Sequence, residues 1–277
     1  MKAALIQISS TDDPFMNMKM VAEQVCIAAD NGAEWILTPE VTNMVSLSRS
    51  HQIDHLVDEA NDPVLGKMRE VACKKDIWIS VGSLAVKSDD PDGRFANRSF
   101  LISPNGDIVA RYDKIHMFDV AVSEKETYRE SAGFRPGDRA VLAHTDFGTV
   151  GLTICYDLRF PALFRILAQS GAQFITVPAA FSPVTGRAHW EPLLRARAIE
   201  NGVFILAAAQ TGLHLSTGKR RETYGHSMVI SPWGEVLADA GDEVGIIFVD
   251  LDTKVVEKTR DRIPSLLHDR EFLTPNE

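Results

Sequence analysis

The sequence predicts an α/β protein whose two sheets pack face to face, with helices on the outside. Two observations support this fold class. Short apolar stretches, such as 35–37 and 203–209, alternate with longer segments whose apolar residues recur at helical spacing. The pattern apolar-Ile-Ser-Pro-x-Gly-acid-apolar-apolar also occurs twice, at 101–109 and 229–237. We interpret the repeat as two similar halves that contribute one sheet each; a chance likeness between two common turns is the alternative.

Composition limits the classes of function. The chain has 277 residues, of which 45% are hydrophobic and 24% are charged, as in an average globular protein. No stretch has the composition of a linker, so one large domain is expected. The 29 basic and 38 acidic residues give a net charge of -9, which disfavours nucleic acid and anionic membranes as partners.

Cysteine usage and hydropathy indicate a cytoplasmic protein. Cys26, Cys73 and Cys155 are odd in number and widely spaced, and no C-x-x-C pair occurs, so reduced thiols are expected. The apolar run 203–209 is much shorter than the ~20 residues of a membrane-spanning helix. Acidic residues follow the first expected strand too closely for a secretory signal.

The first half of the chain is expected to alternate strands and helices. Strands are expected at 3–8, 35–38, 77–86, 95–102 and 107–112, and helices at 16–30 and 63–75. Pro39 ends the second of these strands and leaves Glu40 at its carboxyl end, where the ligands of α/β sheets gather. Lys114 follows the last strand just as closely. Cys26 and Cys73 lie on the two helices, where we expect them to serve packing.

The second half repeats this alternation. Strands are expected at 141–143, 150–154, 174–178, 203–209, 224–230 and 244–250, and helices at 159–169 and 187–201. A polar loop at 117–137 joins the halves, and loops of that length are usually functional or disordered. A charged loop around 219–222 separates two strands. Residues after 251 are polar and are expected to pack on a neighbour or to fray.

Cys155 stands at an abrupt change of pattern. The apolar run 150–154 stops at this residue and helical spacing begins at Arg159, so the thiol is expected at a strand-to-helix turn. Such a turn can place one side chain in a cleft beside backbone N–H groups. Free cysteine is also often buried, so a packing role is the alternative. Tyr156 and Asp157 favour the first interpretation, because an inert core cysteine would usually have apolar neighbours.

Glu40, Lys114 and Cys155 each lie at or just past the end of an expected strand. Amide hydrolysis needs a nucleophile, a group that accepts and returns a proton, and positive charge where the oxyanion forms. A thiol with a pKa of about 8.5 is mostly protonated at pH 7 and reacts slowly without a neighbouring base or cation. A carboxylate and an ammonium group meet these needs, so the three side chains are candidates for one catalytic site.

These residues resemble the motifs of a known family. Pro39-Glu40, Tyr112-Asp-Lys114-Ile-His116 and Cys155-Tyr-Asp-Leu-Arg-Phe-Pro161 are similar, in order and spacing, to the Glu-Lys-Cys motifs of the nitrilase superfamily of carbon-nitrogen hydrolases. The likeness extends from residue 3 to about residue 250. It implies a four-layer αββα sandwich formed by residues 1–251, a homodimer with 252–277 at its interface, and no metal or cofactor.

The resemblance also implies a mechanism. Cys155 would attack the carbonyl carbon and form a thioester, while Glu40 would accept the thiol proton, protonate the leaving nitrogen and later activate water. Lys114 and the backbone N–H of Tyr156 would hold the oxyanion. A second carboxylate of the family is matched by Glu130, in the loop after the lysine, and would keep the ammonium charged despite burial. The alternative for Glu130 is a solvated loop acid.

Further residues are expected to bind a carboxylated substrate. They are Tyr156, Arg159, Phe181, Thr185 and Arg187. The segment 181–191 opens a helix close to where Cys155 should lie, and a helix N-terminus favours anions. Arg159 and Arg187 would hold the substrate carboxylate in the same place. Arg195 and Arg197 are expected to pair with nearby glutamates instead.

Four segments resemble the branch of the superfamily called deaminated glutathione amidase, which cleaves the amide between a 2-oxoglutarate unit and cysteinylglycine. They are 185–191, 195–200, 207–210 and 224–228. Omega-amidases, which release ammonia from 2-oxoglutaramate, share the first segment and are one alternative. N-carbamoyl amino acid amidohydrolases and nitrilases are others. A scaffold for partner binding is disfavoured, because a buried acid, base and thiol are costly to keep together.

Other chemistries have weaker support. His51 and His55 have the i,i+4 spacing of zinc ligands on a helix, but no third ligand with glutamate lies near, so a surface pair is expected. The sequence has no G-x-S-x-G, P-loop or G-x-G-x-x-G motif. Serine hydrolases and nucleotide-binding proteins are therefore disfavoured.

Overall fold

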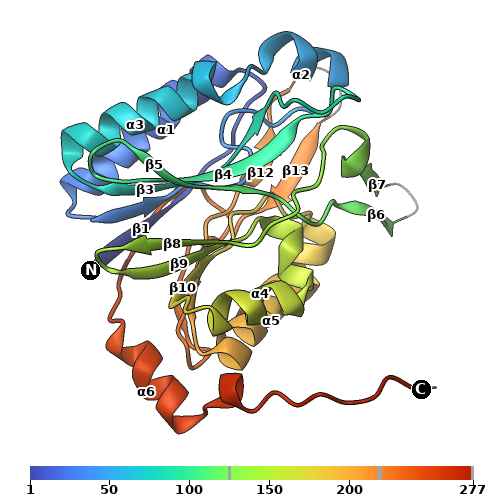
Figure 1. The fold of residues 1–277 in the computed structure, drawn as a ribbon. Helices are drawn as coiled ribbons and strands as arrows, with labels where there is room; N and C mark the ends of the chain where they lie inside the picture. Colours follow the sequence, from blue (N-terminus) through green and yellow to red (C-terminus); the bar gives the residue numbers. More distant parts are fainter. Residues whose placement is uncertain (124–125, 217–219, 276–277) are drawn as a thin grey trace.

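The computed structural model describes residues 1–123, 126–216 and 220–275 and forms a four-layer αββα sandwich (Figure 1). Two six-stranded sheets face each other. Helices α1 (Pro14–Asp30) and α3 (Pro63–Lys75) cover the outer face of the first sheet. Helices α4 (Pro161–Gln169) and α5 (Pro183–Asn201) cover the outer face of the second. The predicted fold class is confirmed.

The two sheets have the same topology. The first has the order β16-β1-β2-β3-β4-β5 and the second the order β8-β9-β10-β11-β14-β15. The first consists of β1 (Lys2–Gln7), β2 (Trp35–Leu37), β3 (Trp78–Val86), β4 (Ala96–Ile102), β5 (Ile108–Asp113) and β16 (Gly245–Asp250). The second consists of β8 (Val141–Thr145), β9 (Gly148–Leu152), β10 (Phe174–Thr176), β11 (Phe204–Ala207), β14 (Met228–Ile230) and β15 (Val236–Asp239). In this order, both sheets run through the same sequence of antiparallel, parallel, parallel, antiparallel and antiparallel neighbours.

The repeated Ser-Pro-x-Gly turn forms the same hairpin in each sheet. The N–H of Gly106 donates to the Ser103 carbonyl at 2.8 Å, and the N–H of Gly234 donates to the Ser231 carbonyl at 2.9 Å. Both glycines have positive φ, 80° and 87°, which a residue with a side chain rarely adopts. Each turn leads into the edge strand of its sheet. The repeat therefore marks two similar hairpins, which favours two similar halves over a chance likeness. The expectation that each half contributes one whole sheet was wrong, because β16 from the second half joins the first sheet beside β1.

The main core lies between the sheets, and a second core lies under α1 and α3. Side chains of β1 alternate between them: Ala3 and Leu5 belong to the first and Ala4 and Ile6 to the second. This alternation follows from the two-residue period of a strand. Because a slip of one residue would exchange the two faces, burial on both sides fixes the strand register and hence the positions of the strand ends.

The two polar loops expected at 117–137 and 219–222 contain regular structure. The first holds a hairpin of β6 (Asp119–Ser123) and β7 (Glu126–Arg129), followed by the turn η2 (Glu130–Ala132). The second region contributes β13 (Arg221–Tyr224), which pairs with β12 (Thr211–His214). Lys219 lies outside the described residues. The expectation of irregular loops was wrong, because short strands between turn residues carry little apolar periodicity.

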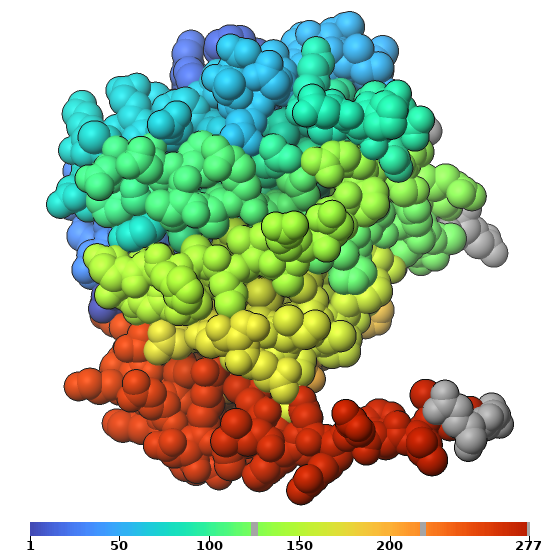
Figure 2. All heavy atoms as spheres, viewed as in Figure 1, coloured from blue at the N-terminus to red at the C-terminus, as the bar shows by residue number. Residues whose placement is uncertain are grey.

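Residues after 251 begin with a helix that packs on the same chain. In α6 (Lys254–Arg262), Val256 is buried in the main core, and Arg260 donates to the Ala172 carbonyl at 2.6 Å. The turn η4 (Ser265–Leu267) follows, and beyond it the chain runs outward as an extended segment (Figures 1 and 2). Contact of this segment with a second subunit stays a prediction. Within the described ranges, no helix has the length and apolar character needed to cross a membrane.

The helical cysteines differ from each other. Cys26 is half-buried against the core under α1 and α3, as expected for a packing residue. Cys73 is exposed, so its expected packing role was wrong. It lies on α3 between the buried positions Val71 and Ala72 and the basic end of the helix, where the apolar stripe has turned away from it.

Candidate active site

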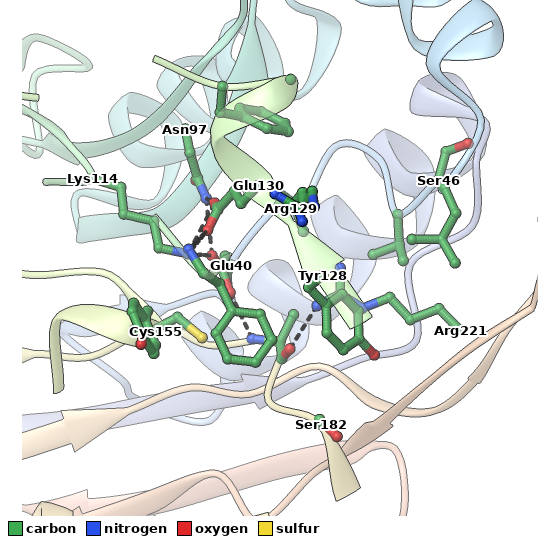
Figure 3. A pocket seen from close by; sticks show the side chains of 18 of the residues that line it. Glu40, Ser46, Asn97, Lys114, Tyr128, Arg129, Glu130, Cys155, Ser182 and Arg221 are labelled. Carbon is green, nitrogen blue, oxygen red and sulfur yellow. Dashed lines mark hydrogen bonds and ion pairs between the residues drawn. The ribbon is translucent and has the colours of Figure 1, made fainter. Parts of the chain in front are cut away.

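A cavity of about 350 Å³ lies at the end of the sandwich where β2, β5 and β9 finish (Figure 3). Glu40 follows β2, Lys114 follows β5 and Cys155 follows β9, and all three line this cavity. The structure thus brings together three side chains that are far apart in the sequence. The volume is within the range of small-molecule sites, about 300–1,000 Å³.

Cys155 sits on a strained turn between β9 and α4. Its φ is +47°, a left-handed conformation that residues with side chains seldom adopt. The turn is held by a hydrogen bond from the Cys155 N–H to the Pro178 carbonyl at 2.9 Å. A second bond runs from the Ile154 N–H to the Asp157 carboxylate at 2.9 Å. The side chain is 7% exposed, and its sulfur faces Glu40 and Lys114 (Figure 3).

Asp157 ties this turn to the end of β5. Its fully buried carboxylate accepts from the Tyr112 hydroxyl at 2.6 Å and contacts His116 Nδ1 at 2.7 Å. Burial, followed by the charge of Asp157, raises the pKa of Tyr112, so its hydroxyl remains a donor. Lys114 lies between Tyr112 and His116 in the chain. The network therefore fixes Lys114 relative to Cys155.

Lys114 bridges two carboxylates. Its Nζ donates to Glu40 Oε1 at 2.8 Å and to Glu130 Oε1 and Oε2 at 3.0 and 2.9 Å. Lys114 is 2% exposed and Glu40 is 4% exposed. Glu130 also accepts from the Phe118 N–H at 2.7 Å. Its position against the ammonium group argues against a solvated loop acid.

Asn97 is a member of this network that the sequence reasoning missed. Its Nδ2 donates to Glu40 Oε1 at 2.9 Å and to Glu130 Oε1 at 3.3 Å. The other oxygen of Glu40 accepts from the Ala180 N–H at 2.8 Å. Asn97 lies inside strand β4, next to Arg98 and Ser99, and a run of polar residues in a strand gives no sign of the partner of each. Only the pairing of β4 with β5 brings it beside Lys114.

Burial and charge set the protonation of the three central groups. Burial raises the pKa of the Cys155 thiol well above its ordinary value, and the charge of Glu40 raises it further. Burial alone would raise the pKa of Glu40, but Lys114 and, to a lesser extent, Arg221 hold it below its ordinary value. Burial alone would lower the pKa of Lys114, but Glu130 and Glu40 raise it. At neutral pH the site holds a thiol, a carboxylate and an ammonium group.

Such a set can perform acyl transfer. A carboxylate beside a thiol can accept its proton during attack, which a thiol with a raised pKa requires. An ammonium group at the same point can stabilise an oxyanion in surroundings that exclude water. The arrangement supplies a nucleophile, a base and an electrostatic stabiliser without help from solvent.

The residues expected to bind substrate divide into two groups. Tyr156, Phe181 and Thr185 line the cavity. Arg159 and Arg187 do not, which corrects their expected place beside a substrate carboxylate. The guanidinium of Arg159 contacts His189 Nδ1 at 3.3 Å and lies 5.5 Å from the centre of the Phe181 ring. Because α5 begins at Pro183, Arg187 lies in its second turn and not at its N-terminus, and it is exposed there.

Three arginines not singled out from the sequence line the cavity instead. They are Arg49, Arg129 and Arg221. The sequence assigned no role to Arg221, because its segment reads as a charged loop, whereas in the structure Arg221 begins β13. Arg195 and Arg197 pair with Glu191 and Glu200, as expected.

The histidine pair lies apart from the cavity. His51 and His55 stack with ring centroids 4.0 Å apart on α2 (Arg49–His55). His51 Nε2 lies 2.8 Å from the Asp12 carbonyl. Across the described parts of the chain, no group of three or more His, Cys, Asp or Glu residues could hold a metal ion.

Known proteins are similar to this chain over nearly its whole length. A deaminated glutathione amidase of Yersinia enterocolitica is 40% identical over 96% of this chain and 92% of its own. The crystal structure of the Caenorhabditis elegans nitrilase and fragile histidine triad fusion protein matches 97% of this chain with a TM-score of 0.89 and 37% identity. This chain spans 65% of that longer chain.

A third relative is an amidase from Nesterenkonia sp. AN1, solved with acrylamide added at its active-site cysteine. It matches 95% of this chain and 98% of its own with a TM-score of 0.77 and 25% identity. Residues 2–261 of the present sequence match the family model described as carbon-nitrogen hydrolase. Since this match covers nearly the whole chain, the protein belongs to the carbon-nitrogen hydrolase family and is a hydrolase of carbon-nitrogen bonds.

Proposed function

We propose that this protein is a thiol-dependent amidase that hydrolyses deaminated glutathione to 2-oxoglutarate and cysteinylglycine. The contact of Lys114 with Glu40 and Glu130 beside the Cys155 thiol is the observation that carries the reaction type. The name of the Yersinia relative and the arginines of the cavity support the substrate. No cofactor is needed, since the chain itself supplies the nucleophile, base and cation.

The first half of the reaction forms a thioester. Glu40 accepts the proton of the Cys155 thiol while the sulfur bonds to the amide carbon, and the carbonyl oxygen becomes an oxyanion. Lys114 and the Tyr156 backbone N–H stabilise that charge. The carbonyl then re-forms, the carbon-nitrogen bond breaks, and Glu40 passes its proton to the leaving nitrogen. Cysteinylglycine departs and the 2-oxoglutaryl group remains on sulfur.

The second half returns the enzyme to its resting state. Glu40 accepts a proton from water while the oxygen bonds to the thioester carbon, again forming an oxyanion beside Lys114. The carbon-sulfur bond then breaks, 2-oxoglutarate leaves, and the proton on Glu40 returns to the Cys155 sulfur. One water is consumed: one of its protons reaches sulfur through Glu40, and the other leaves the new carboxyl group to solvent as 2-oxoglutarate ionises. Glu130 and Asn97 keep Glu40 and Lys114 in place through both halves.

The setting of the enzyme is part of the proposal. We place it in the cytoplasm, as its free cysteines indicate. We also expect a homodimer in which the C-terminal segment contacts the partner. Leu267, Phe272 and Leu273 are at least 79% exposed, and large apolar side chains on an extended segment favour such a contact.

Assays with purified protein test the proposed substrate. Deaminated glutathione, 2-oxoglutaramate, N-carbamoyl amino acids and simple nitriles are compared by kcat/KM. The highest value is expected for deaminated glutathione, and Cys155→Ala should abolish turnover while keeping the fold. A clear preference for 2-oxoglutaramate would make the protein an omega-amidase. Turnover that survives Cys155→Ala would refute the thioester mechanism.

A further inference from the structure

The catalytic end of the cavity carries a net negative charge. Two carboxylates, those of Glu40 and Glu130, face the single ammonium group of Lys114, and the raised pKa of Cys155 adds no compensating charge. A carboxylated substrate would be repelled unless another cation lies close. Arg49, Arg129 and Arg221 line the same cavity, so each is a candidate for that cation.

Two of these arginines are poorly suited to hold a buried carboxylate. Arg49 donates to the carbonyls of Gly133 and Gly93 at 3.2 and 2.8 Å, and its guanidinium lies 4.1 Å from the centre of the Phe95 ring. These contacts engage it in holding the surrounding loops. Arg129 is exposed, so water screens its charge.

Arg221 differs from both, because only part of its guanidinium group is hydrogen-bonded within the protein. Its Nη2 donates to the Ala180 carbonyl at 2.7 Å, a neutral partner. Its Nε is buried and has no hydrogen-bond partner within the described residues. No ion pair found among those residues includes Arg221. A buried charged donor without a partner lowers the stability of the fold, because its desolvation is not compensated. Such a group in a native protein calls for an explanation, for example a partner that is supplied by a ligand.

The position of Arg221 relative to Glu40 follows from Ala180. The N–H of this residue donates to Glu40 Oε2 at 2.8 Å, and its carbonyl accepts from Arg221 Nη2 at 2.7 Å. One residue therefore connects the two groups, so Nη2 lies at most about 10 Å from the carboxylate, given backbone bond lengths. Figure 3 shows Arg221 reaching from β13 towards the cavity beside Tyr128.

Glu40 marks the amine side of the reaction, because it hands a proton to the leaving nitrogen. A group that shares Ala180 with Glu40 lies on that side. In cysteinylglycine the carboxylate is about two residues from the leaving nitrogen, a reach of at most about 7 Å. The spacing of Glu40 and Arg221 accommodates this length.

We propose that Arg221 binds the terminal carboxylate of the leaving amine, and so selects amides of amino acids or peptides over primary amides. The inference rests on the proposed function and deepens it. It assigns the choice between deaminated glutathione and 2-oxoglutaramate to one residue, since the two substrates share their acyl half and only the first has a carboxylate on its amine.

The test compares these two substrates in Arg221→Met and Arg221→Lys. For Arg221→Met, kcat/KM with deaminated glutathione should fall about 10- to 100-fold, mainly through KM, as expected for the loss of a charge-assisted hydrogen bond. With 2-oxoglutaramate the loss should be at least about fivefold smaller, because only the effect of Arg221 on the pKa of Glu40 remains, and circular dichroism checks that the variant is folded. Arg221→Lys should recover part of the loss. Arg220→Met is the matched control, because Arg220 is exposed and does not line the cavity.

A change in the substrate provides an independent test of the contact between Arg221 and the carboxylate. Replacing the glycine carboxylate of deaminated glutathione by an amide should lower kcat/KM of the wild type about as much as Arg221→Met does, and should not affect Arg221→Met further. Equal losses on both original substrates would overturn the inference, because Arg221 would then serve the acyl half or the fold. Unchanged kinetics on both would overturn it too.

Failure of the proposed function would look different. A wild type inactive on deaminated glutathione but active on other amides would refute the substrate. The role of Arg221 would then be tested with two cleaved substrates that differ only at the end of the amine part, which is a carboxylate in one and a carboxamide in the other. Absence of a preference for the carboxylate in the wild type would overturn it.

Discussion

Strands β4 and β5 carry two charged clusters that differ mainly in burial. The cavity network consists of Glu40, Asn97, Lys114 and Glu130. The rim cluster consists of Glu59, Arg98, Arg111, Asp113 and Arg135. Asn97 and Arg98 are neighbours in sequence, as are Asp113 and Lys114, and adjacent residues of a strand point to opposite faces. The segments of β4 and β5 thus contribute to both clusters, and Glu40, Glu59, Glu130 and Arg135 join them from turns and loops.

The two clusters show what burial adds to charge. The side chains of Lys114 and Glu40 are 2% and 5% exposed, whereas those of Arg98 and Asp113 are 21% and 16% exposed. In the cavity network the carboxylates are shielded from water. The charge of Glu40 therefore raises the pKa of the neighbouring Cys155 thiol. In the rim cluster water and salt reach the ion pairs and reduce their contribution to the free energy of folding. The first cluster also lies beside Cys155, where Glu40 can accept the proton of the thiol.

The largest effect is expected from removing the cation of the cavity network. Lys114→Met should lower kcat about 1,000-fold or more with a smaller change in KM, because the oxyanion exists only in the transition state and its intermediates. It also leaves two buried carboxylates without their partner, which should cost about 3–5 kcal/mol in the free energy of unfolding. Steady-state kinetics and urea denaturation measure the two effects. A change confined to KM would make Lys114 a binding residue.

A smaller loss is expected for Glu130→Gln, which keeps the shape of the side chain and removes its charge. Glu130 is the largest cause that raises the pKa of Lys114 against burial, so the variant should lower that pKa. We expect kcat to fall about 10- to 100-fold, less than on removing the oxyanion stabiliser itself. The fall should become steeper as the pH rises, because the remaining carboxylate, Glu40, holds the pKa of Lys114 up less strongly than two carboxylates do. An unchanged pH profile would contradict the electrostatic role of Glu130.

The pH dependence of the wild type separates a resting thiol from a resting thiolate. Because the pKa of Glu40 is lowered from 4.5, kcat/KM should fall on acidification only below about pH 4.5, where the base becomes protonated. Because the pKa of Cys155 is raised above 9.0, the loss at alkaline pH should begin only above about pH 9, where the proton for the leaving nitrogen disappears. Between pH 6 and 8, kcat/KM should vary less than about twofold. A titration in that range would favour a preformed thiolate.

The comparison also explains which features the sequence could reveal. Glu40, Lys114 and Cys155 follow expected strands, so the ordering of strands was enough to suggest that they converge. Asn97 was missed because the pairing of β4 with β5 brings it beside Lys114. The sequence of β4 alone does not show which residues lie next to it in the fold. No role was assigned to Arg221 for a related reason, since the four consecutive charged residues at 219–222 resemble a solvated loop.

One error in an expected boundary, at the start of α5, affected the prediction of the site. The helix α5 begins at Pro183, so Arg187 lies in its second turn on an exposed face and not at its N-terminus. The sequence predicted that arginines hold a substrate carboxylate, but the two that it named do not line the cavity. The fold class was easier to predict, because burial of alternating apolar residues is repeated over many strands and does not depend on one boundary.

The smallest effect is expected on the rim. Arg98→Met breaks ion pairs with Glu59 and Asp113 at 2.9 and 2.6 Å, and partial exposure limits the cost to about 1 kcal/mol, or a Tm lower by about 2–4 °C. Its kcat/KM should stay within about twofold of the wild type, since the cluster lies on the other face of the strands. Arg111→Met, which loses one ion pair of a more exposed residue, should change Tm still less. A tenfold fall in kcat for Arg98→Met would show that Asp113 transmits strain to Lys114 through the backbone, and that the two faces are not independent.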